Sequence, residues 1–527
     1  MFEKALLPLS QKIIALTCVA GLTLAQLPAF AVEHAAEVQM DSDQKILHLL
    51  NRLTYGPRPG DVDDVKKMGV EQFIQQQLHP ETIQMPEALN SYVDGVESIN
   101  STPSDLFRQY SIVALRANKN VGGRKLSDDE RKDLQKEQGD NYRKLYNESA
   151  SARLRRAVES PRQLQELMVD FWFNHFNVSN DKGLVHLWTG AYEQQAIRPY
   201  VFGHFRDLVE ATAHHPAMLF YLDNWQNTKP GGIQFAGRGK GSKNNFEGLN
   251  ENYARELMEL HTLGVDGGYT QADVIALAKV LTGLGLPPQN PALLRIGQVE
   301  IGRFGSAFAP QRHDFGDKVL LGTTIRGTGE PEIEQAIDIL CKAPATAHHI
   351  SYQMAQYFVC DEPPKALVDH LSETYLRTDG DIRAMLNDLF HSHEFWNPKF
   401  ANSKFKSPYR FVISSLRASN VALADYKPVL GFLRQLGMPL YGCLTPDGYK
   451  NTQTAWLSPD ALLRRIQFAT GLGTGKLPNN PLDPLDYKDV STSMNGLFSN
   501  NTLTVVASAP AGLKSSVLLG SPEFMNY

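Results

Sequence analysis

The sequence predicts a mainly α-helical protein: one large multi-helix unit with a small β hairpin or sheet near residues 294–325. Apolar residues recur at helical spacing through most of the chain, whereas short β-like runs are confined to that one region. No clean linker separates independent domains. Of the 527 residues, 42% are hydrophobic and 21% charged, which is typical of a globular protein with a buried core.

The first 31 residues have the pattern of a secretory signal peptide. Lys4 and Lys12 precede the apolar run IIALTCVAGLTLAQLPAF, which is followed by the small residue Ala31 in the cleavage pattern Ala29 to Ala31. The run is short for a membrane span. We expect cleavage after Ala31, a periplasmic or extracellular protein, and no transmembrane segment in the mature chain; an uncleaved anchor is the alternative.

Helical patterns then follow one another along the predicted mature unit, 32–527. The first apolar stripe consists of Ile46, Leu49, Leu50 and Leu53. Two short helices follow, separated at Gly69 and stopped before Pro80. Longer helices are predicted over ESPRQLQELMVDFWFNHF and RDLVEATAHHPAMLFYLDN. The segment 228–248 is glycine-rich and basic and is predicted to be a flexible loop, because it lacks the strand-to-helix context of a phosphate-binding loop.

The β insertion is predicted from RIGQVEIGRF and KVLLGTTI, which flank a polar turn. Helices resume with PEIEQAIDILCK and continue to about residue 470. The segment 474–505 is rich in Pro, Asn, Ser and Thr and is expected to be an irregular surface excursion.

The net charge bears on nucleic-acid binding, and the cysteine content bears on disulfide formation. The formal net charge of −5 gives no electrostatic reason to expect nucleic-acid binding. Beyond the signal peptide the chain has Cys341, Cys360 and Cys443. An exported protein could form one disulfide from these, and Cys341 with Cys360 is favoured by proximity in sequence.

The stretch NENYARELMELHTLG, 250–264, combines charge and helical spacing. On a helical wheel at about 100° per residue, a polar stripe forms on one side while His261 faces the apolar side. The stripe consists of Asn252, Arg255, Glu256 and Glu259. Asn250 suits an N-cap and Gly264 a helix stop, and Thr270 with Asp273 predicts a capping box for the next helix.

Two interpretations of this stripe remain open. It could be a solvated face on which Arg255 pairs with Glu259, worth only about 0.2–0.5 kcal/mol. It could instead face a cleft, where Glu256 and Glu259 act as acid and base or bind a cation together with a histidine from elsewhere. His261 alone is more typical of a hydrogen-bonded core histidine.

Several further motifs occur along the chain in a fixed order. They include HLLNRLTYGPRPGDVDDVKKMGVEQFIQQQL, FWFNHFNVS, HPAMLFYLDN, HDFGDKVLLG, KFKSPYRFVISSLRA, PDGYKNTQTAWLSPDALLRRIQFA and the closing SPEF. With the 250–264 stretch, they resemble the bacterial family called domain of unknown function 1800 over nearly the whole mature chain. His261 departs from the family, which often has an aromatic residue there.

The resemblance implies a secreted or envelope protein that is mostly helical, but it supplies no reaction. It also implies a possible partner, because such proteins often occur beside the family called domain of unknown function 1501, which is similar to sulfatases and alkaline phosphatases.

Other candidate site residues come from these motifs. His175 lies among aromatic residues, where its pKa could shift, and it is a candidate base or ligand; a packed histidine is the alternative. His313, Asp314 and Lys318 lie in or beside a polar turn, where they could bind substrate or merely stabilise the turn. The sequence contains no Gly-x-Ser-x-Gly elbow, no His-Glu-x-x-His zinc helix and no phosphate-binding loop.

Two functions are compatible with this sequence. The first is an exported hydrolase of an extracellular glycan or related polymer. Its catalytic residues would be Glu256, Glu259, His175, Arg255 and Asn252, its substrate-binding residues would be His313, Asp314 and Lys318, and a divalent cation could be its cofactor. The second is a non-catalytic envelope scaffold that docks a sulfatase-like partner.

Overall fold

The computed structural model describes residues 40–119, 126–230, 248–287, 300–494 and 496–527. The described residues from Met40 to Tyr527 form one compact unit by their internal contacts. The predicted signal peptide, 1–31, and most of the predicted glycine-rich loop, 228–248, lie outside the described residues.

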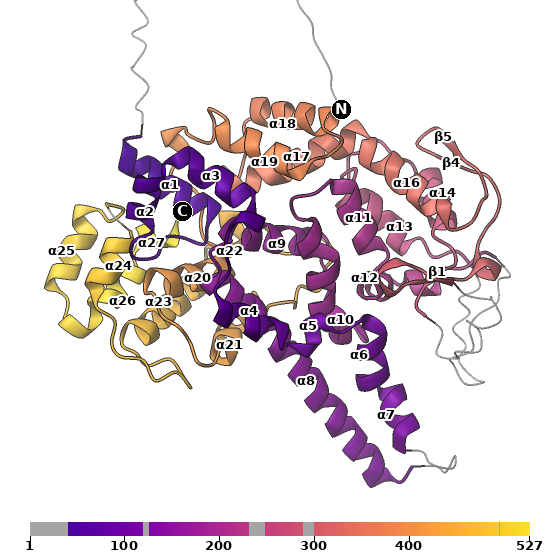
Figure 1. The fold of residues 1–527 in the computed structure, drawn as a ribbon, viewed down its shortest axis with the longest axis horizontal. Coiled ribbons are helices and arrows are strands. Elements are labelled where there is room, and N and C mark those ends of the chain that lie inside the picture. The colour runs from indigo at the N-terminus through magenta and orange to yellow at the C-terminus, as the bar shows by residue number, and fades with distance from the viewer. Residues whose placement is uncertain (1–39, 120–125, 231–247, 288–299, 495) are drawn as a thin grey trace, which may run out of the picture. The chain divides into compact units, whose positions relative to one another are not determined.

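Helices dominate the unit, which confirms the mainly α prediction (Figure 1). The predicted first stripe is buried, with Leu49 and Leu53 fully inaccessible to solvent. The helices before residue 230 are α1 (Ser42–Leu53), α2 (Asp61–Met68), α3 (Val70–Leu78), η1 (Pro80–Thr82), α4 (Glu87–Asp94), α5 (Glu97–Asn100), α6 (Pro103–Tyr110), α7 (Ile112–Lys119), α8 (Asp128–Glu159), α9 (Gln163–His175), α10 (Val185–Tyr192), η2 (Glu193–Ile197), η3 (Arg198–Tyr200), α11 (Phe205–Ala213), α12 (Pro216–Tyr221) and η4 (Asn224–Gln226).

The second half begins with α13 (Asn252–Glu256), η5 (Leu257–His261) and α14 (Gln271–Val280). After the strands come α16 (Pro331–Lys342), α17 (Pro344–Phe358), α18 (Lys365–Arg377), α19 (Ile382–His391), η8 (Pro398–Phe400), α20 (Pro408–Ala418), α21 (Lys427–Gln435), α22 (Gln453–Trp456), α23 (Pro459–Gly473), α24 (Tyr487–Ser493), α25 (Asn500–Ser508), η9 (Ala511–Leu513), α26 (Lys514–Leu519) and α27 (Pro522–Met525).

The small β insertion is present as two antiparallel sheets. In the first, β3 (Ala307–Phe308) pairs with both β1 (Leu284–Gly285) and β2 (Glu300–Ile301), with short 3-10 turns η6 (Arg303–Gly305) and η7 (Pro310–Arg312) nearby. The second is the hairpin of β4 (Lys318–Leu320) and β5 (Thr323–Ile325). The insertion therefore begins at Leu284, earlier than predicted, and residues 294–299 of the predicted range lie outside the described part of the chain.

Two other expectations differ from the structure. The segment 474–505 contains α24 and the first part of α25, because its polar composition includes the N-caps Asp486 and Ser499.

Cys341, Cys360 and Cys443 are all buried free thiols, so the predicted Cys341–Cys360 disulfide is wrong. The Cys360 thiol donates instead to the carbonyl of Glu362 at 3.2 Å.

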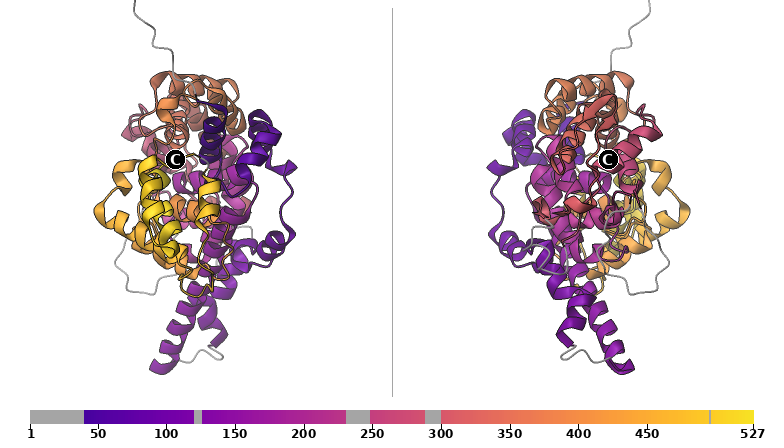
Figure 2. Two further views of the ribbon diagram at one scale, coloured as in Figure 1. Left: turned by 90° about the vertical axis from the view of Figure 1, so that its left-hand side faces the viewer. Right: turned by 90° about the vertical axis from the view of Figure 1, so that its right-hand side faces the viewer.

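The ends of the described chain meet within the fold. The backbone of Tyr527 pairs with that of Lys404, and the guanidinium of Arg52 in α1 lies 4.8 Å from the Tyr527 ring centroid. Side views show the C-terminal helices α24 to α26 lying together, while α7 runs beside α8 (Figure 2). Within the described ranges, no helix has the length and apolar character needed to cross a membrane.

Several histidines are buried within this core. His215 is fully buried and N-caps α12, where its Nδ1 accepts from the backbone N–H of Ala217 at 3.1 Å. Burial lowers the pKa of His215 from 6.5 to about 3, because the charged ring would lose its hydration. The folded state therefore holds this ring neutral at pH values where the unfolded chain binds a proton.

Folding stability should consequently fall as pH drops from about 6.5 towards 4, since the unfolded state gains protons first. His215→Asn keeps an N-cap acceptor but cannot titrate, and should remove roughly 3 kcal/mol of this loss at pH 4. Urea denaturation across this pH range measures the effect. His370→Asn is the matched control, because the His370 side chain is 55% exposed; equal pH slopes in all three proteins would contradict the assignment.

Candidate functional site

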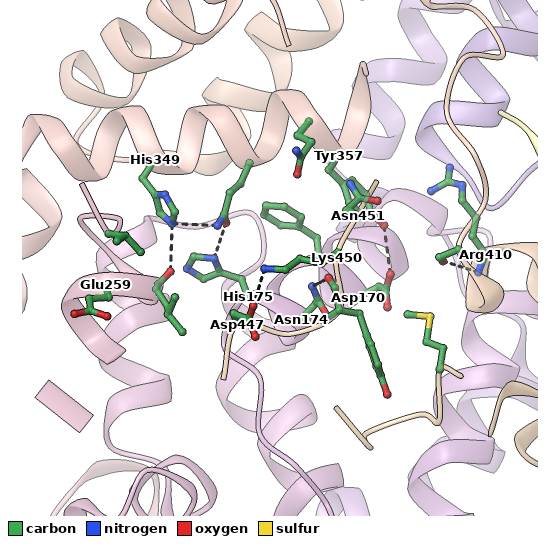
Figure 3. A pocket seen from close by; sticks show the side chains of 18 of the residues that line it. Asp170, Asn174, His175, Glu259, His349, Tyr357, Arg410, Asp447, Lys450 and Asn451 are labelled. Carbon is green, nitrogen blue, oxygen red and sulfur yellow. Dashed lines mark hydrogen bonds and ion pairs between the residues drawn. The ribbon is translucent and has the colours of Figure 1, made fainter. Parts of the chain in front are cut away.

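A polar cavity of about 270 Å³ lies where several helices and one loop converge (Figure 3). Helices α9, η5, α17 and α20 contribute to its wall, together with the loop 443–451. Its polar lining includes Asp170, Asn174, His175, Glu259, His349, Gln353, Gln356, Ser407, Arg410, Asp447, Lys450 and Asn451. Its apolar lining consists of the aromatic residues Phe171, Tyr357, Tyr449 and Tyr527 and the aliphatic residues Leu260, Val265 and Met438.

The helix predicted over 250–264 brings one of the two glutamates of its polar stripe to this cavity. It is not a regular α-helix, since α13 continues into a π-helical turn, η5, in which the hydroxyl of Thr262 donates to the carbonyl of Leu257 at 2.7 Å. Single π-turns are rare and frequently mark functional sites. Glu259 lies in this turn and lines the cavity, whereas His261 is buried in the core beside Phe176.

The rest of the polar stripe supports this helix from outside the cavity. Arg255 forms ion pairs with Glu259 at 3.4 Å and Glu251 at 3.3 Å. The amide of Asn252 donates to the carbonyl of Leu222 at 3.1 Å. Glu256 does not line the cavity, but burial and the nearby charges of Glu259 and Asp447 raise its pKa.

His175 faces the cavity from the end of α9, yet both its ring nitrogens already have partners. Nε2 lies 3.0 Å from the carbonyl oxygen of His261, and Nδ1 lies 2.7 Å from Oε1 of Gln353, whose Nε2 lies 3.0 Å from Nε2 of His349. Burial, with a contribution from His349, lowers the pKa of His175 to about 4. A neutral imidazole has one N–H and can donate to only one of these two oxygens. Because both ring nitrogens face a partner, the ring shapes the wall between η5 and α17 rather than offering a free base.

Asp170, one turn before Asn174 on α9, is a carboxylate that the sequence reasoning did not select. Its Oδ1 accepts from Arg153 at 2.6 Å, and Tyr357 donates to Oδ2 at 3.4 Å. Burial raises the pKa of Asp170 against the opposing charge of Arg153, which Asp170 shares with Glu193. Asp170 thus combines access to the cavity with a raised pKa.

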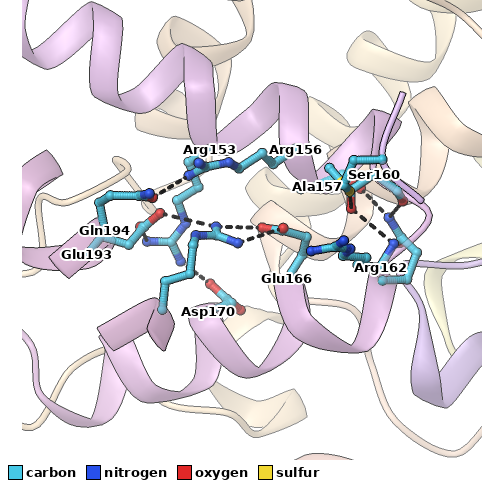
Figure 4. Close-up of polar contacts among 12 residues, drawn as sticks. Arg153, Arg156, Ala157, Ser160, Arg162, Glu166, Asp170, Glu193 and Gln194 are labelled. Carbon is cyan, nitrogen blue, oxygen red and sulfur yellow. Dashed lines mark hydrogen bonds and ion pairs between the residues drawn. The ribbon is translucent and has the colours of Figure 1, made fainter. Parts of the chain in front are cut away.

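Behind Asp170 lies a buried network of charges (Figure 4). Arg153 joins Asp170 to Glu193, and the guanidinium of Arg198 donates two parallel hydrogen bonds of 2.8 Å to Glu166. Glu193 lies in η2, a second π-turn. Because these charges are paired and hydrogen-bonded, the network holds α8, α9 and η2 in a fixed relation beneath the cavity.

The loop 443–451 covers the other side of the cavity and is docked on α9. Asn174 exchanges two hydrogen bonds with the backbone of Tyr449, donating at 2.9 Å and accepting at 2.8 Å. Gly448 has φ +67°, and a Cβ there would lie 2.3 Å from the carbonyl oxygen of Asn174. Only glycine allows this close approach, so the motifs FWFNHFNVS and PDGYKN form one structural unit.

This loop presents Asp447 and Lys450 to the cavity. The Lys450 ammonium donates to Asp447 at 2.6 Å. Burial acts to raise the pKa of Asp447, but hydrogen bonds from Lys450 and Thr445 outweigh it and hold that pKa below its usual value. The pKa of Asp447 is therefore shifted in the direction opposite to that of Asp170.

The three predicted substrate-binding residues do not line this cavity. His313 is fully buried, with Nε2 lying 3.0 Å from a carboxylate oxygen of Glu332, and the buried Lys318 ammonium donates to the same carboxylate. The Asp314 side chain accepts from the backbone of Gly316 at 2.9 Å, which stabilises the turn. These residues fix the β4–β5 hairpin against α16 and α14.

The expected divalent cation has no evident site in the described part of the chain. No group of three or more His, Cys, Asp or Glu side chains among those residues is arranged to hold a metal ion. The carboxylates at the cavity instead have cationic partners: Arg153 for Asp170, Arg255 for Glu259 and Lys450 for Asp447.

The protein is therefore mainly helical, and its described residues form a cavity that is lined by the carboxylates of Asp170, Glu259 and Asp447. The family model described as "Protein of unknown function (DUF1800)" matches residues 48–526. The chain therefore belongs to this family, as its motifs suggested. Neither the comparison with curated proteins nor that with solved structures gives a match.

Proposed function

We propose that the protein is an exported hydrolase that cleaves a glycan or related polymer in the periplasm or outside the cell. The observation that supports this function is a pair of carboxylates in one cavity whose pKa values are shifted in opposite directions. Asp170 has a raised pKa and Asp447 a lowered one. Such a separation divides the acid role from the base or nucleophile role.

In this mechanism, the protonated form of Asp170, which a raised pKa makes more populated, donates its proton to the leaving oxygen as the glycosidic C–O bond breaks. Ionised Asp447 either activates the attacking water or attacks the anomeric carbon itself, after which water releases the sugar. Glu259 supplies a third carboxylate that can accept hydrogen bonds from substrate hydroxyls. The volume of about 270 Å³ and the mixture of aromatic rings with amides suit a single sugar unit of a chain.

Asp170→Asn tests this assignment. The amide retains the shape of the side chain but cannot deliver a proton, so turnover should fall by at least about 100-fold. Reducing-end release from a panel of extracellular polysaccharides measures turnover. The wild-type rate should decline at high pH as Asp170 loses its proton and at low pH as Asp447 gains one, and Asp447→Asn should be similarly inactive.

Asp128→Asn is the matched control, because the Asp128 side chain is 91% exposed on α8, and it should keep full activity. Thermal unfolding of each variant separates lost chemistry from lost structure. Turnover in Asp170→Asn equal to that of the wild type would contradict the proposal.

A second function, docking of a sulfatase-like envelope partner, has one observation in its favour. Large apolar side chains are exposed near the C-terminus, including Leu463 and Ile466 on α23 and Leu513 in the adjoining η9. The same assay distinguishes the two functions. Absence of turnover on every polymer, with partner copurification unchanged in Asp170→Asn, would favour docking over hydrolysis.

A further inference from the structure

One end of the cavity is backed by buried basic side chains that form no ion pair with an acidic side chain of the described residues. They are Arg52, Lys406, Arg410 and Arg465, none more than 4% exposed. Within the described ranges their side chains donate to carbonyl or hydroxyl oxygens: Phe400 O at 2.6 Å, Ser414 Oγ at 2.9 Å, Thr54 O at 2.9 Å and Lys406 O at 2.7 Å, respectively. Uncompensated buried cations are unfavourable, so this end of the cavity attracts negative charge.

Among these groups, Lys406 and Arg465 have lowered pKa values. Burial, followed by the charges of Arg410 and Arg465, lowers the pKa of Lys406. Burial lowers the pKa of Arg465 to about 9. Each acidic side chain at the cavity has its own ion-pair partner, and the charge of Arg410 also acts to lower the pKa of Asp170.

Arg410 is the member of this group that lines the cavity, at the end opposite Glu259 and His349 (Figure 3). Its Nη2 donates to the carbonyls of Asn51 and Thr54, and its guanidinium carbon lies 3.8 Å from the Tyr527 ring centroid. Its Nε is buried without a hydrogen-bond partner, and its side-chain hydrogen bonds to described residues use Nη2 and leave Nη1 without one.

Helix α20 adds to the attraction at the same end. Ser407 lines the cavity and N-caps this helix of 11 residues, and its hydroxyl accepts from the backbone N–H of Arg410 at 3.2 Å. The helix dipole therefore places partial positive charge beside the guanidinium. A planar guanidinium whose Nη1 has no partner among the described residues is well suited to an oxyanion.

We infer that the substrate carries an oxyanion, either a carboxylate or a sulfate ester, and that Arg410 binds it at this end of the cavity. This inference rests on the proposed function, because it names the substrate class of the same site. The glycan would thus be acidic, with its charged substituent against Arg410 and its scissile bond between Asp170 and Asp447.

Calorimetric titration of the wild-type protein with D-glucuronate, glucose 6-sulfate and glucose tests the inference without any turnover. At least one acidic sugar should bind about 10- to 100-fold more tightly than glucose, as expected for a charge-assisted hydrogen bond. The preferred acidic sugar distinguishes carboxylate from sulfate ester. Equal binding of all three sugars, or no binding of either acidic sugar, would overturn the inference.

Arg410→Gln and Arg410→Lys test whether Arg410 causes the preference for the acidic sugar. The first should remove the preference for the acidic sugar, and the second should retain only part of it, because an ammonium cannot reproduce the fork of a guanidinium. Arg326→Gln, at a 77% exposed arginine, should leave the preference intact. If the Arg410 variants do not fold, the comparison of three sugars on the wild type decides alone.

The outcomes separate this inference from the proposed hydrolysis. Anion preference without Asp170-dependent turnover would retain the inference and refute the reaction. Asp170-dependent turnover of neutral glycans, with no anion preference in binding, would retain the reaction and overturn the inference.

Discussion

Replacing Arg153 with methionine is expected to lower the free energy of unfolding by about 3–5 kcal/mol, because breaking a buried ion network leaves uncompensated charge behind. Arg153 is 4% exposed and donates to both Glu193 and Asp170. Methionine fills much of the same volume, so the loss measures the stranded carboxylates rather than a cavity. Urea denaturation at neutral pH measures it.

The aromatic surroundings of Arg153 increase the expected effect. Its guanidinium carbon lies 5.1 Å from the ring centroid of Phe173 and 5.3 Å from those of Tyr409 and Tyr441. These rings restrict water from solvating the carboxylates once the arginine is gone. Acidification should partly rescue the variant, because protonation removes the unpaired charge.

Arg143→Met is the matched control on the same helix. Arg143 is 72% exposed and pairs with Asp140 one turn away, and exposed pairs contribute about 0–1 kcal/mol. Similar losses from the two substitutions would show that the buried network does not stabilise the fold as described.

The sequence was sufficient to predict the fold class because its helices carry local signals. The stripe of Ile46 and Leu49 became a buried helix face, and Thr270 with Asp273 formed the predicted capping box. The Arg255–Glu259 pair also formed as helical spacing suggested. Each of these interactions joins residues fewer than five positions apart, which is the range over which sequence pattern is informative.

The site was predicted only in part because its decisive contacts are long-range. Glu259 and His175 both line the cavity, but a regular wheel could not anticipate the π-turn that separates Glu259 from Glu256. Asp170 was missed, although Glu166, Asp170 and Asn174 recur at a spacing of four within an apolar helix. That polar stripe was the available signal. Its partners, Arg153 and the loop 443–451, could not be assigned without tertiary structure.

The contact between the loop 443–451 and α9 can be tested by replacing Gly448. Gly448→Ala should reduce turnover by about 100-fold, because a Cβ would lie 2.3 Å from the backbone oxygen of Asn174 and the loop must lift from α9. The positive φ adds about 1–2 kcal/mol of strain. Displacement would break both hydrogen bonds between Asn174 and Tyr449 and move Asp447 away from Asp170.

Gly437→Ala separates the two causes of this effect, since Gly437 also has a positive φ, +80°, but a Cβ there would meet nothing within 4 Å. It should lose stability through strain alone and retain most of the turnover. Measuring turnover and thermal unfolding of both variants tests the argument. If Gly448→Ala and Gly437→Ala impair turnover equally, contact between the loop and α9 does not position Asp447, and the carboxylate pair must be aligned by other interactions.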